Sequence, residues 1–406
     1  MYLTHLSLTN FRNFARLDID LPRGPLLLVG ANGQGKTSLL EAIYFLATLS
    51  SFHADHERQL INFLVAREAL AVARIVAIFS SDQDQHRMEV RIIQESNGIN
   101  GSSRVRKEVL VDNLKVKISE TAGYFNAVLF LPHMVRIIEG PPDERRRFLN
   151  LAISQVSPPY NRAFSEYSQS LGQRNALLKQ INEFGGDVNQ LDFWDGLVAT
   201  NGARLIQARI TAIQELERFA ARIHRELTRG GGVLRLVYQP AFDPLPAPPG
   251  QYTLPLDAPV DRTGLAVDKI AEGFLHALAA CRSEDIARGI TTIGPHRDEL
   301  RFIESGIDLG TYGSRGQVRT AMLAIKFAEV EWMHAKTGRS PVLLLDEALA
   351  ELDPLRRDDL LGRVATCEQM LLTTTDLALF SPDFVQKAAL WQVQDGRVEE
   401  NTHSSG

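Results

Sequence analysis

Apolar and polar positions alternate near the start of the chain and then give way to an apolar run. Strand-forming side chains take every second position in 2–8 and again in 17–21, which predicts two strands. Residues 26–29 form a short apolar run suited to a buried strand, and apolar side chains then recur at helical spacing over 39–47. The pattern therefore predicts two strands, a buried strand, a turn and a helix.

The middle of the chain changes from a strand pattern to a helix pattern. Alternation within 88–118 predicts an antiparallel sheet after the first helix. From about Asp143 apolar residues recur at helical spacing, most clearly over 206–227, and Gly230–Gly232 then end the helix. The proline-rich stretch 240–261 is typical of an exposed loop.

Composition narrows the class of protein. At 406 residues, with 44% apolar and 23% charged side chains, the chain is expected to be an ordinary soluble protein of two domains. No apolar run approaches the roughly 18 residues of a membrane span, and the start lacks a signal-peptide pattern, so we expect a cytoplasmic protein without a membrane partner. Cys281 and Cys367 lie far apart without a C-x-x-C, which favours two buried structural cysteines over a disulfide or zinc site.

The net charge of −5 argues against broad attraction to nucleic acid. Any surface that attracts DNA phosphates must therefore be a local cluster of basic side chains. The candidate basic positions are Arg104, Arg106, Lys107, Lys115, Lys117, Arg145, Arg146, Arg147, Arg222, Arg225 and Arg229.

A glycine-rich loop between the buried strand and the first helix fits G-x-x-x-x-G-K-[ST]. It consists of Gly30, Ala31, Asn32, Gly33, Gln34, Gly35, Lys36 and Thr37. The glycines allow backbone N–H groups to close on phosphate oxygens, and the helix that opens at Lys36 directs its positive end toward them. Lys36 is predicted to reach the β- and γ-phosphates, and Thr37 to place its hydroxyl on Mg²⁺. The alternative is a glycine turn that binds nothing, and the flanking strand and helix favour the nucleotide loop.

A second apolar strand, 342–345, ends in Asp346 and Glu347, which is the Walker B arrangement. Asp346 is predicted to hold the Mg²⁺ shell and Glu347 to polarise the attacking water. These acids lie about 300 residues after the phosphate loop, so an insertion is expected between them. We expect an α/β fold with an ATPase lobe made of 1–142 and 290–406, and an inserted helical lobe over 143–289.

A third motif lies one helix before the acidic strand. Its residues are Ser314, Arg315, Gly316 and Gln317, followed by an apolar helix from Val318 to about Trp332. Small residues at a helix N-terminus suit phosphate, and in this position they are typical of an ABC-type signature that closes on the γ-phosphate held by a second subunit. A polar helix cap is the alternative. Glu351–Asp353 stands where a D-loop runs along such a dimer seam.

With these motifs the chain resembles the RecF family of DNA-repair proteins, relatives of the Rad50 and SMC heads. The resemblance covers nearly the whole chain. Its segments are Leu8–Phe14, Asn32–Thr37, Leu40–Ile43, Gly140–Asn150, Gly294–Asp298, Ser314–Gln317 and Leu344–Asp353.

This resemblance implies an ABC-type P-loop ATPase head, a mixed sheet with flanking helices, carrying an inserted and mainly helical second lobe. It implies weak, DNA-stimulated hydrolysis of ATP with Mg²⁺. It further implies an ATP-dependent homodimer that clamps single-stranded and gapped duplex DNA in recombinational repair and replication restart. RecR and RecO are the implied partners, and through them the RecA recombinase.

Several positions depart from the family pattern. Pro132-His133-Met134 stands where the family usually has the Pro-Glu-Asp of a Q-loop-like nucleotide sensor. Glu347 stands where a second Asp is usual, and Ala350 where Ser is usual. Glu is competent to orient water, so hydrolysis is still expected. Thr373–Thr375 occupies the place of the switch histidine of other ABC ATPases, as it does in RecF.

Other polar residues allow two interpretations. Arg12 either reaches the nucleotide or is an exposed loop arginine. Arg145–Arg147 either brace the two lobes, which we favour, or contact DNA phosphates. His296–Asp298 is assigned to lobe packing or DNA contact because no nucleophile accompanies it. His53 and His56 lack metal-ligand partners and are expected to be solvated.

Three rival functions are less consistent with these features. A transport ATPase subunit would not explain the inserted lobe or the Pro-x-x-Arg-Arg segment. A coiled-coil protein of the Rad50 or SMC type would need a far longer insert. A small-molecule kinase would not explain the signature helix.

Overall fold

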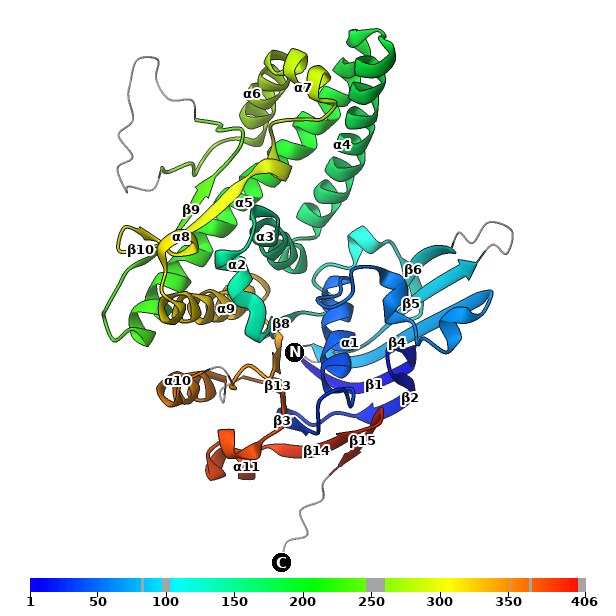
Figure 1. Ribbon diagram of the computed structural model, residues 1–406, viewed down its shortest axis with the longest axis vertical. Helices are drawn as coiled ribbons and strands as arrows, with labels where there is room; N and C mark the ends of the chain where they lie inside the picture. The colour runs from blue at the N-terminus through cyan, green and yellow to red at the C-terminus, as the bar shows by residue number, and fades with distance from the viewer. Residues whose placement is uncertain (82–83, 97–102, 246–259, 351, 365–366, 401–406) are drawn as a thin grey trace, which may run out of the picture. The chain divides into compact units, whose positions relative to one another are not determined.

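The computed structural model describes residues 1–81, 84–96, 103–245, 260–350, 352–364 and 367–400. The chain divides into two compact units. The first consists of Met1–Met134 together with the residues from Glu329 onward, and the second is Val135–Ala328. In Figure 1 the first unit contains the blue and red ends of the colour scale, and the second contains the green and yellow part.

An antiparallel sheet in the first unit has the strand order β2-β1-β4-β5-β6-β7. Its strands are β1 (Tyr2–Phe11), β2 (Phe14–Asp20), β4 (Leu70–Ser81), β5 (Asp84–Ser96), β6 (Ser103–Val111) and β7 (Leu114–Val116). The alternation near the start and within 88–118 is thereby confirmed, because each strand presents every second side chain to one face. Ile118 lies outside the sheet, in the short helix η3 (Ile118–Glu120).

A second sheet joins the two sequence-distant parts of this unit, in the order β15-β14-β3-β13-β12-β8. Its strands are β3 (Gly24–Val29), β8 (Ala127–Phe130), β12 (Val342–Asp346), β13 (Gln369–Thr374), β14 (Ala389–Gln394) and β15 (Arg397–Glu400). All neighbours are parallel except the β14–β15 hairpin. Because β12 pairs with β8 and β13 with β3, the carboxyl ends of strands from both parts of the sequence lie at one edge.

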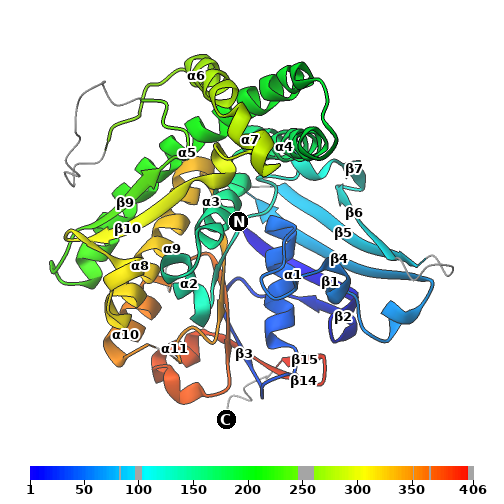
Figure 2. The ribbon, with the colours of Figure 1, turned by 45° about the horizontal axis from the view of Figure 1, so that its top comes forward.

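Helix α1 (Lys36–Thr48) packs against strands of both sheets. Leu39 and Ile43 of this helix are fully buried in one core with Phe11 and Phe79 of the antiparallel sheet and Leu344 of the parallel sheet. Figure 2 shows α1 lying along β1 and β4. The remaining described helices of the unit are η1 (Glu57–Leu60), η2 (Val65–Arg67), η4 (Pro132–Val135), α10 (Pro354–Val364), η7 (Leu377–Leu379) and α11 (Pro382–Lys387).

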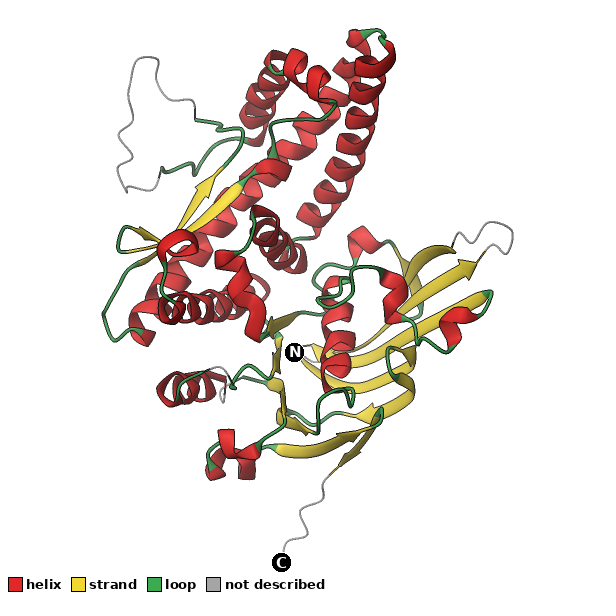
Figure 3. Ribbon diagram, viewed as in Figure 1, coloured by secondary structure: helices red, strands yellow, loops and turns green. Residues whose placement is uncertain are grey.

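The second unit is built on a long helical hairpin of α4 (Pro158–Phe184) and α5 (Leu191–Leu227), shown in red in Figure 3. The apolar stripe predicted over 206–227 lies in α5, which ends just before the glycine cluster. The unit also contains α2 (Arg136–Glu139), α3 (Pro142–Val156), η5 (Val188–Gln190), α6 (Val267–Ala280), α7 (Arg282–Arg288), η6 (Pro295–Arg297) and α8 (Leu309–Tyr312). A small sheet, β11-β10-β9, comprises β9 (Leu234–Gln239), β10 (Glu299–Glu304) and β11 (Ile307–Asp308).

The boundaries of the compact units differ from those expected for the inserted lobe. The sequence placed them at 143 and 289, whereas the units divide after Met134 and after Ala328, inside α9 (Arg315–Thr337). Pairing of β9 with β10 is the reason, because it holds the residues that follow 289 against the helices. The second unit therefore contains a sheet as well as helices. Much of the predicted 240–261 loop lies outside the described residues.

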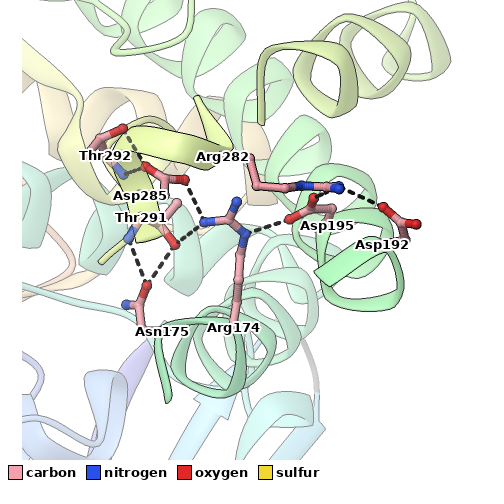
Figure 4. Close-up of polar contacts among 8 residues, drawn as sticks. All are labelled: Arg174, Asn175, Asp192, Asp195, Arg282, Asp285, Thr291 and Thr292. Atoms are coloured by element: carbon pink, nitrogen blue, oxygen red, sulfur yellow. Dashed lines mark hydrogen bonds and ion pairs between the residues drawn. The ribbon is translucent and has the colours of Figure 1, made fainter. Parts of the chain in front are cut away.

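A network of buried charges joins the helices of the second unit (Figure 4). Arg174 of α4 has no solvent exposure, and it donates hydrogen bonds to Asp195 of α5 (Nε to Oδ1, 2.6 Å) and to Asp285 of α7 (Nη1 to Oδ2, 2.7 Å). Thr292 donates two hydrogen bonds to Asp285, and Arg282 donates one to Asp195. The charges are compensated within the unit, which is what makes their burial tolerable.

Within the described ranges, none of the helices is long and apolar enough to cross a membrane. Cys281 and Cys367 are free and half-buried, rather than fully buried as expected. Burial raises the pKa of the Cys367 thiol to about 11, so it is a poor nucleophile at neutral pH.

Candidate nucleotide-binding site

The glycine loop follows β3 and is held between two neighbouring turns. A Cβ atom at Gly30 would lie 2.3 Å from the carbonyl oxygen of Val393, on the adjacent strand β14. Gly35 has a φ of +116° and its Cβ would lie 2.6 Å from Nδ2 of Asn13. Gly30 is required because a side chain there would clash with the neighbouring strand. Gly35 is required because a side chain would clash with Asn13 and because its backbone is left-handed.

Gln34 fixes the shape of the loop. Its carbonyl oxygen accepts hydrogen bonds from Nδ2 of Asn13 (3.2 Å) and from the backbone N–H of Gly396 (3.1 Å). Its side-chain Oε1 accepts a hydrogen bond from the backbone N–H of Asp395 (2.7 Å). The β1–β2 and β14–β15 turns thus preform the loop that the sequence predicted to hold phosphates.

Lys36 is held inside the loop. Its side chain is 4% exposed, and Nζ donates hydrogen bonds to the carbonyl oxygens of Gly30 (2.6 Å) and Ala31 (3.0 Å). Oε1 of Glu347 lies 3.6 Å from the same Nζ. The ammonium group is therefore positioned between the glycine loop and the end of the acidic strand.

Thr37 and Asp346 meet across the parallel sheet. The Thr37 hydroxyl donates to the Asp346 carboxylate, with Oγ1 at 3.0 and 2.9 Å from its two oxygens. The Thr373 hydroxyl donates to Oδ1 of Asp346 (2.6 Å) and accepts a hydrogen bond from the backbone N–H of Glu347 (2.9 Å). A hydroxyl and a carboxylate oxygen side by side fit Mg²⁺, which takes one or two carboxylates plus water and phosphate oxygens.

Metal binding here would rely on the ligands that a nucleotide brings. Among the described residues, no group of three or more His, Cys, Asp or Glu side chains could hold a metal ion. The Thr37–Asp346 pair would supply two of the oxygen ligands, and phosphate and water would complete the shell.

Glu347 has a left-handed backbone, with φ of 47°. Such a conformation is uncommon for a residue other than glycine, and where it occurs it often marks a functional site. The side chain is 37% exposed, in contrast to the buried Asp346. The turn after β12 therefore presents one carboxylate to the cavity while its neighbour is held by hydroxyls.

These residues line a cavity of about 330 Å³. The phosphate-loop side contributes Asn32, Gly33 and Gly35–Ser38, and the strand end contributes Asp346 and Glu347. The loop and the acidic pair, about 300 residues apart in sequence, thus meet in one place as predicted. Their roles toward a nucleotide remain predictions.

The cavity has another wall, which the hydrophobic pattern of the sequence did not place there. It consists of His53, Leu131, Pro132 and His133. His53 is exposed, as expected, but it lies in the cavity wall with its ring centroid 6.2 Å from that of His133. The sequence held a partial signal for His133, since it follows a short apolar run that forms a strand.

The signature residues lie in the second unit, at the start of α9. The backbone N–H of Gln317 donates to Oγ of Ser314 (3.3 Å), and the N–H of Ser314 donates to Oε1 of Gln317 (3.0 Å). This reciprocal pair is a capping box, so the polar-cap interpretation is realised. Arg315 and Ser314 are exposed. Closure of this surface on a second subunit stays a prediction, and Glu351 of the D-loop lies outside the described residues.

Several of the candidate basic side chains are paired with acids. Arg106 contacts Glu95 and Glu108, and Lys115 also contacts Glu108 (2.9 Å). Lys107 pairs with Glu57 (2.5 Å). The further pair Arg222–Glu226 lies at 3.2 Å. These ion pairs lower the charge that the patches offer to DNA.

Arg145 braces the second unit internally. Its Nε and Nη2 donate to the two carboxylate oxygens of Glu299 (2.6 and 2.8 Å), and Nη1 donates to the carbonyl oxygens of Ile138 and Gly140. Arg146 donates to the carbonyl oxygen of Asp298 (2.9 Å). The bracing favoured from the sequence therefore occurs, but between elements of one unit.

His296 and Asp298 serve packing, one of the two roles expected for them. Burial lowers the pKa of His296 to about 4. Its Nε2 donates to the carbonyl oxygen of Thr291 (3.0 Å), which leaves Nδ1 to accept from the Tyr167 hydroxyl (2.7 Å). Asp298 is buried and accepts from Nη1 of Arg209 (2.7 Å).

Arg12 is neither in the cavity wall nor a free loop arginine. It donates from Nε and Nη2 to the carboxylate of Glu41 (2.6 and 2.8 Å) and from Nη1 to the carbonyl oxygen of Gln59 (3.0 Å). Arg12 has a φ of 54°. The contacts tie the β1–β2 turn to α1 and to the segment that follows it.

Comparison with known proteins places this arrangement in a family. The family model described as "RecF/RecN/SMC N terminal domain" matches residues 2–393. The DNA replication and repair protein RecF of Chloroflexus aggregans is 38% identical, covering 98% of this chain and 99% of the relative. The protein of the same name from Bacillus subtilis is 32% identical over 98% of this chain and 100% of its own.

Solved structures agree. A structure of the recombination mediator protein RecF with ATP, in the RecFOR pathway, has a TM-score of 0.81 and 28% identity, covering 98% of this chain and 97% of that one. An SMC head bound to the C-winged helix domain of ScpA has a TM-score of 0.50 and 17% identity, which shows likeness of fold alone. The chain therefore belongs to the RecF family, and its fold is the mixed α/β ABC-type ATPase head that RecF and SMC heads share.

Proposed function

We propose that this protein is an ATP-dependent DNA-binding protein of recombinational repair and replication restart. The observation that carries the proposal is the cavity where Lys36, the Thr37–Asp346 pair and Glu347 meet. It holds a cation, two metal-binding oxygens and an exposed carboxylate, which are the groups that hydrolysis of a nucleoside triphosphate requires. Membership of a family whose curated relatives are named for DNA replication and repair supplies the DNA context.

Each group has a distinct role in this proposal. Backbone N–H groups of Gly30–Thr37 and the Lys36 ammonium bind the phosphates. Thr37 and Asp346 hold Mg²⁺, which when bound neutralises charge on the phosphate oxygens. Glu347 orients water for attack on the γ-phosphate, and the buried hydroxyl of Thr373 keeps Asp346 oriented beside it.

The signature residues Ser314–Gln317 would act on a second copy of the chain. Ser314 and Arg315 are exposed at the N-terminus of a long helix whose first turn lacks acids, which supports an anionic partner at this surface. ATP bound in the cavity of one protomer would meet the signature of the other. Hydrolysis would then release the dimer from DNA.

Dimer formation would also offset the net charge of −5, which opposes binding to DNA phosphates. Two copies of each local basic patch would face the same DNA, in the manner of a clamp on single-stranded or gapped duplex DNA. A similar solved protein is described within the RecFOR pathway. By that likeness we propose RecR and RecO as partners, and loading of RecA as the outcome.

Sedimentation of the protein with and without ATP and gapped duplex DNA tests this proposal. We expect ATP to convert monomer to dimer, to strengthen DNA binding, and to steepen its dependence on salt, because more phosphate contacts release more counterions. DNA should in turn accelerate hydrolysis of ATP. Monomeric protein whose DNA affinity ignores nucleotide would contradict the proposal.

A further inference from the structure

Two adjacent apolar side chains of the first unit are exposed to solvent in the segment between α1 and β4. Phe63 is 66% exposed and Leu64 is 63% exposed, and both lie outside the described lining of the nucleotide cavity. Single exposed apolar side chains are ordinary on a protein surface. Two neighbours on a fixed backbone, however, indicate a surface that contacts a partner.

Hydrogen bonds of Asn62 fix the backbone at this exposed pair. Asn62 is buried, and its backbone N–H donates to the carbonyl oxygen of Asn10 in β1 (2.8 Å). Its side-chain Oδ1 accepts a hydrogen bond from the backbone N–H of Leu64 (3.1 Å), and its carbonyl oxygen accepts one from the N–H of Val65 (3.0 Å). A ligand therefore meets an ordered turn, and binding does not have to restrict a loose loop.

Two arginines flank the exposed pair. Arg58 lies five residues before Phe63 and Arg67 four residues after it, and residues 58–67 contain no Asp or Glu. Both arginines are exposed, and neither guanidinium forms an ion pair within the part of the chain that the structure describes. The turn therefore combines an exposed aromatic ring with two cations that are available to an anionic ligand.

Phe184, at the end of α4 in the second unit, has the opposite surroundings. Its side chain is 82% exposed, but residues 183–192 contain three acids and no Lys or Arg. An anionic ligand would be repelled there and attracted at Phe63. Charge therefore distinguishes two phenylalanines that exposure alone does not.

An exposed aromatic ring beside unpaired cations matches the chemistry of single-stranded nucleic acid. Each unpaired base has a flat face that stacks on an aromatic side chain, and each nucleotide has a phosphate that an arginine can bind. Within a duplex the base faces are covered by their neighbours, and exposing one costs stacking and pairing energy. A gap in a duplex offers unpaired bases without that cost.

We propose that Phe63 stacks on an unpaired base of gapped DNA, while Arg58 and Arg67 bind the flanking phosphates. Leu64 extends the apolar surface beside the ring. This inference rests on the proposed DNA-binding function and adds to it a residue that distinguishes unpaired from fully paired DNA.

The test is the affinity of the full chain, with ATP present, for a gapped duplex and for a fully paired duplex of the same length, measured by fluorescence anisotropy. We expect Phe63→Ala to bind the gapped duplex about 10-fold more weakly, the scale of one base stacked on an aromatic ring, and to bind the paired duplex normally. Phe63→Trp, which keeps a flat ring, should bind both normally. Phe184→Ala is the matched control, since it removes an exposed phenylalanine from acidic surroundings.

Two further measurements separate stacking from charge. A base analogue whose fluorescence falls on stacking, placed in the gap, should be quenched by the wild-type protein and not by Phe63→Ala. Replacement of both Arg58 and Arg67 by Ala should lower the slope of log affinity against log salt by about 2, one for each phosphate contact. Phe63→Ala should leave that slope unchanged.

Wild-type affinity of Phe63→Ala for the gapped duplex would overturn the inference, and weaker binding of RecR or RecO by the same variant would then assign the pair to a protein partner. Equal weakening for gapped and paired DNA, in protein with an unchanged thermal midpoint, would overturn it too, because the ring would then not contact an unpaired base. If the wild-type protein with ATP binds neither DNA, the proposed function itself fails. Wild-type binding together with a normal Phe63→Ala variant removes only the role of Phe63.

Discussion

The phosphate cavity of the first unit and the buried charge network of the second use similar residues for opposite purposes. In the network Arg174, Asp195 and Asp285 are fully buried, and the arginine forms an ion pair with each aspartate. In the cavity Lys36 is held by carbonyl oxygens of its own loop, while Glu347 is 37% exposed on a left-handed backbone. Charges that are fully compensated stabilise a fold, and charges left accessible are able to bind and react.

This contrast predicts that the two regions respond differently to loss of a cation. Lys36→Ala should abolish stable binding of ATP, because it removes the cation aimed at the β- and γ-phosphates. Titration with a fluorescent ATP analogue measures this. The free energy of unfolding should change little, since the loop is fixed by hydrogen bonds to Gln34 and the acid nearest to Lys36, Glu347, is partly exposed. Lys117→Ala, an exposed lysine of the same unit, is the control and should bind ATP normally.

Arg174→Met should have the reverse effect. It leaves Asp195 and Asp285 as buried, poorly compensated carboxylates, and breaking such a pair costs about 3–5 kcal/mol of folding free energy. Chemical denaturation followed by circular dichroism measures the loss, and ATP affinity of the folded protein should persist. Arg288→Met, which removes an exposed pair with Glu284, should cost less than about 0.5 kcal/mol. Equal losses in the two variants would refute the assignment of the network.

Glu347→Gln should separate binding of ATP from its hydrolysis within the cavity. The amide cannot accept a proton or orient water as the carboxylate does, so hydrolysis should slow by about 10²-fold or more while ATP still binds. Single-turnover hydrolysis measures the rate. Hydrolysis at the wild-type rate would show that another residue orients the attacking water.

The packing histidine of the second unit predicts a smaller, pH-dependent effect. Burial holds the pKa of His296 at about 4, below its usual value near 6.5. The unfolded state therefore binds more protons between these values, and the free energy of unfolding falls as pH drops through that window, by about 2–3 kcal/mol. His296→Gln should flatten this part of the pH profile. An unchanged slope in that variant would assign the acid sensitivity to other groups.

The sequence predicted features that depend on short stretches of chain. The glycine loop, α1 and the acidic end of β12 each follow from a local pattern, and the sheet brings them together as expected. The family resemblance marked the segment of His133 as the place of a nucleotide sensor, but no local pattern put it in the cavity wall, because its position depends on the pairing of β8 with β12. His53 was missed because it is placed by the buried carboxylate of Glu41, which no periodicity marks.

The boundaries of the compact units also depend on contacts between residues far apart in the sequence. Pairing of β9 with β10 joins residues about 60 positions apart, and the Arg145–Glu299 ion pair joins residues 154 positions apart. A one-dimensional helix pattern contains no information on such partners. The same limit applies to the basic patches, whose acidic neighbours come largely from adjacent strands and turns.

The central claim is that ATP is shared between two protomers, and complementation of two inactive variants tests it most directly. Lys36→Ala lacks a working phosphate loop, and Ser314→Arg places a bulky cation where the signature would meet the partner's γ-phosphate. Each variant alone should lack ATPase activity, although Ser314→Arg should still bind ATP as a monomer. Mixing them should restore part of the activity, because one composite site combines the intact loop of one chain with the intact signature of the other. If heterodimers form without recovering ATPase, or if Ser314→Arg alone hydrolyses ATP normally, the shared site is contradicted.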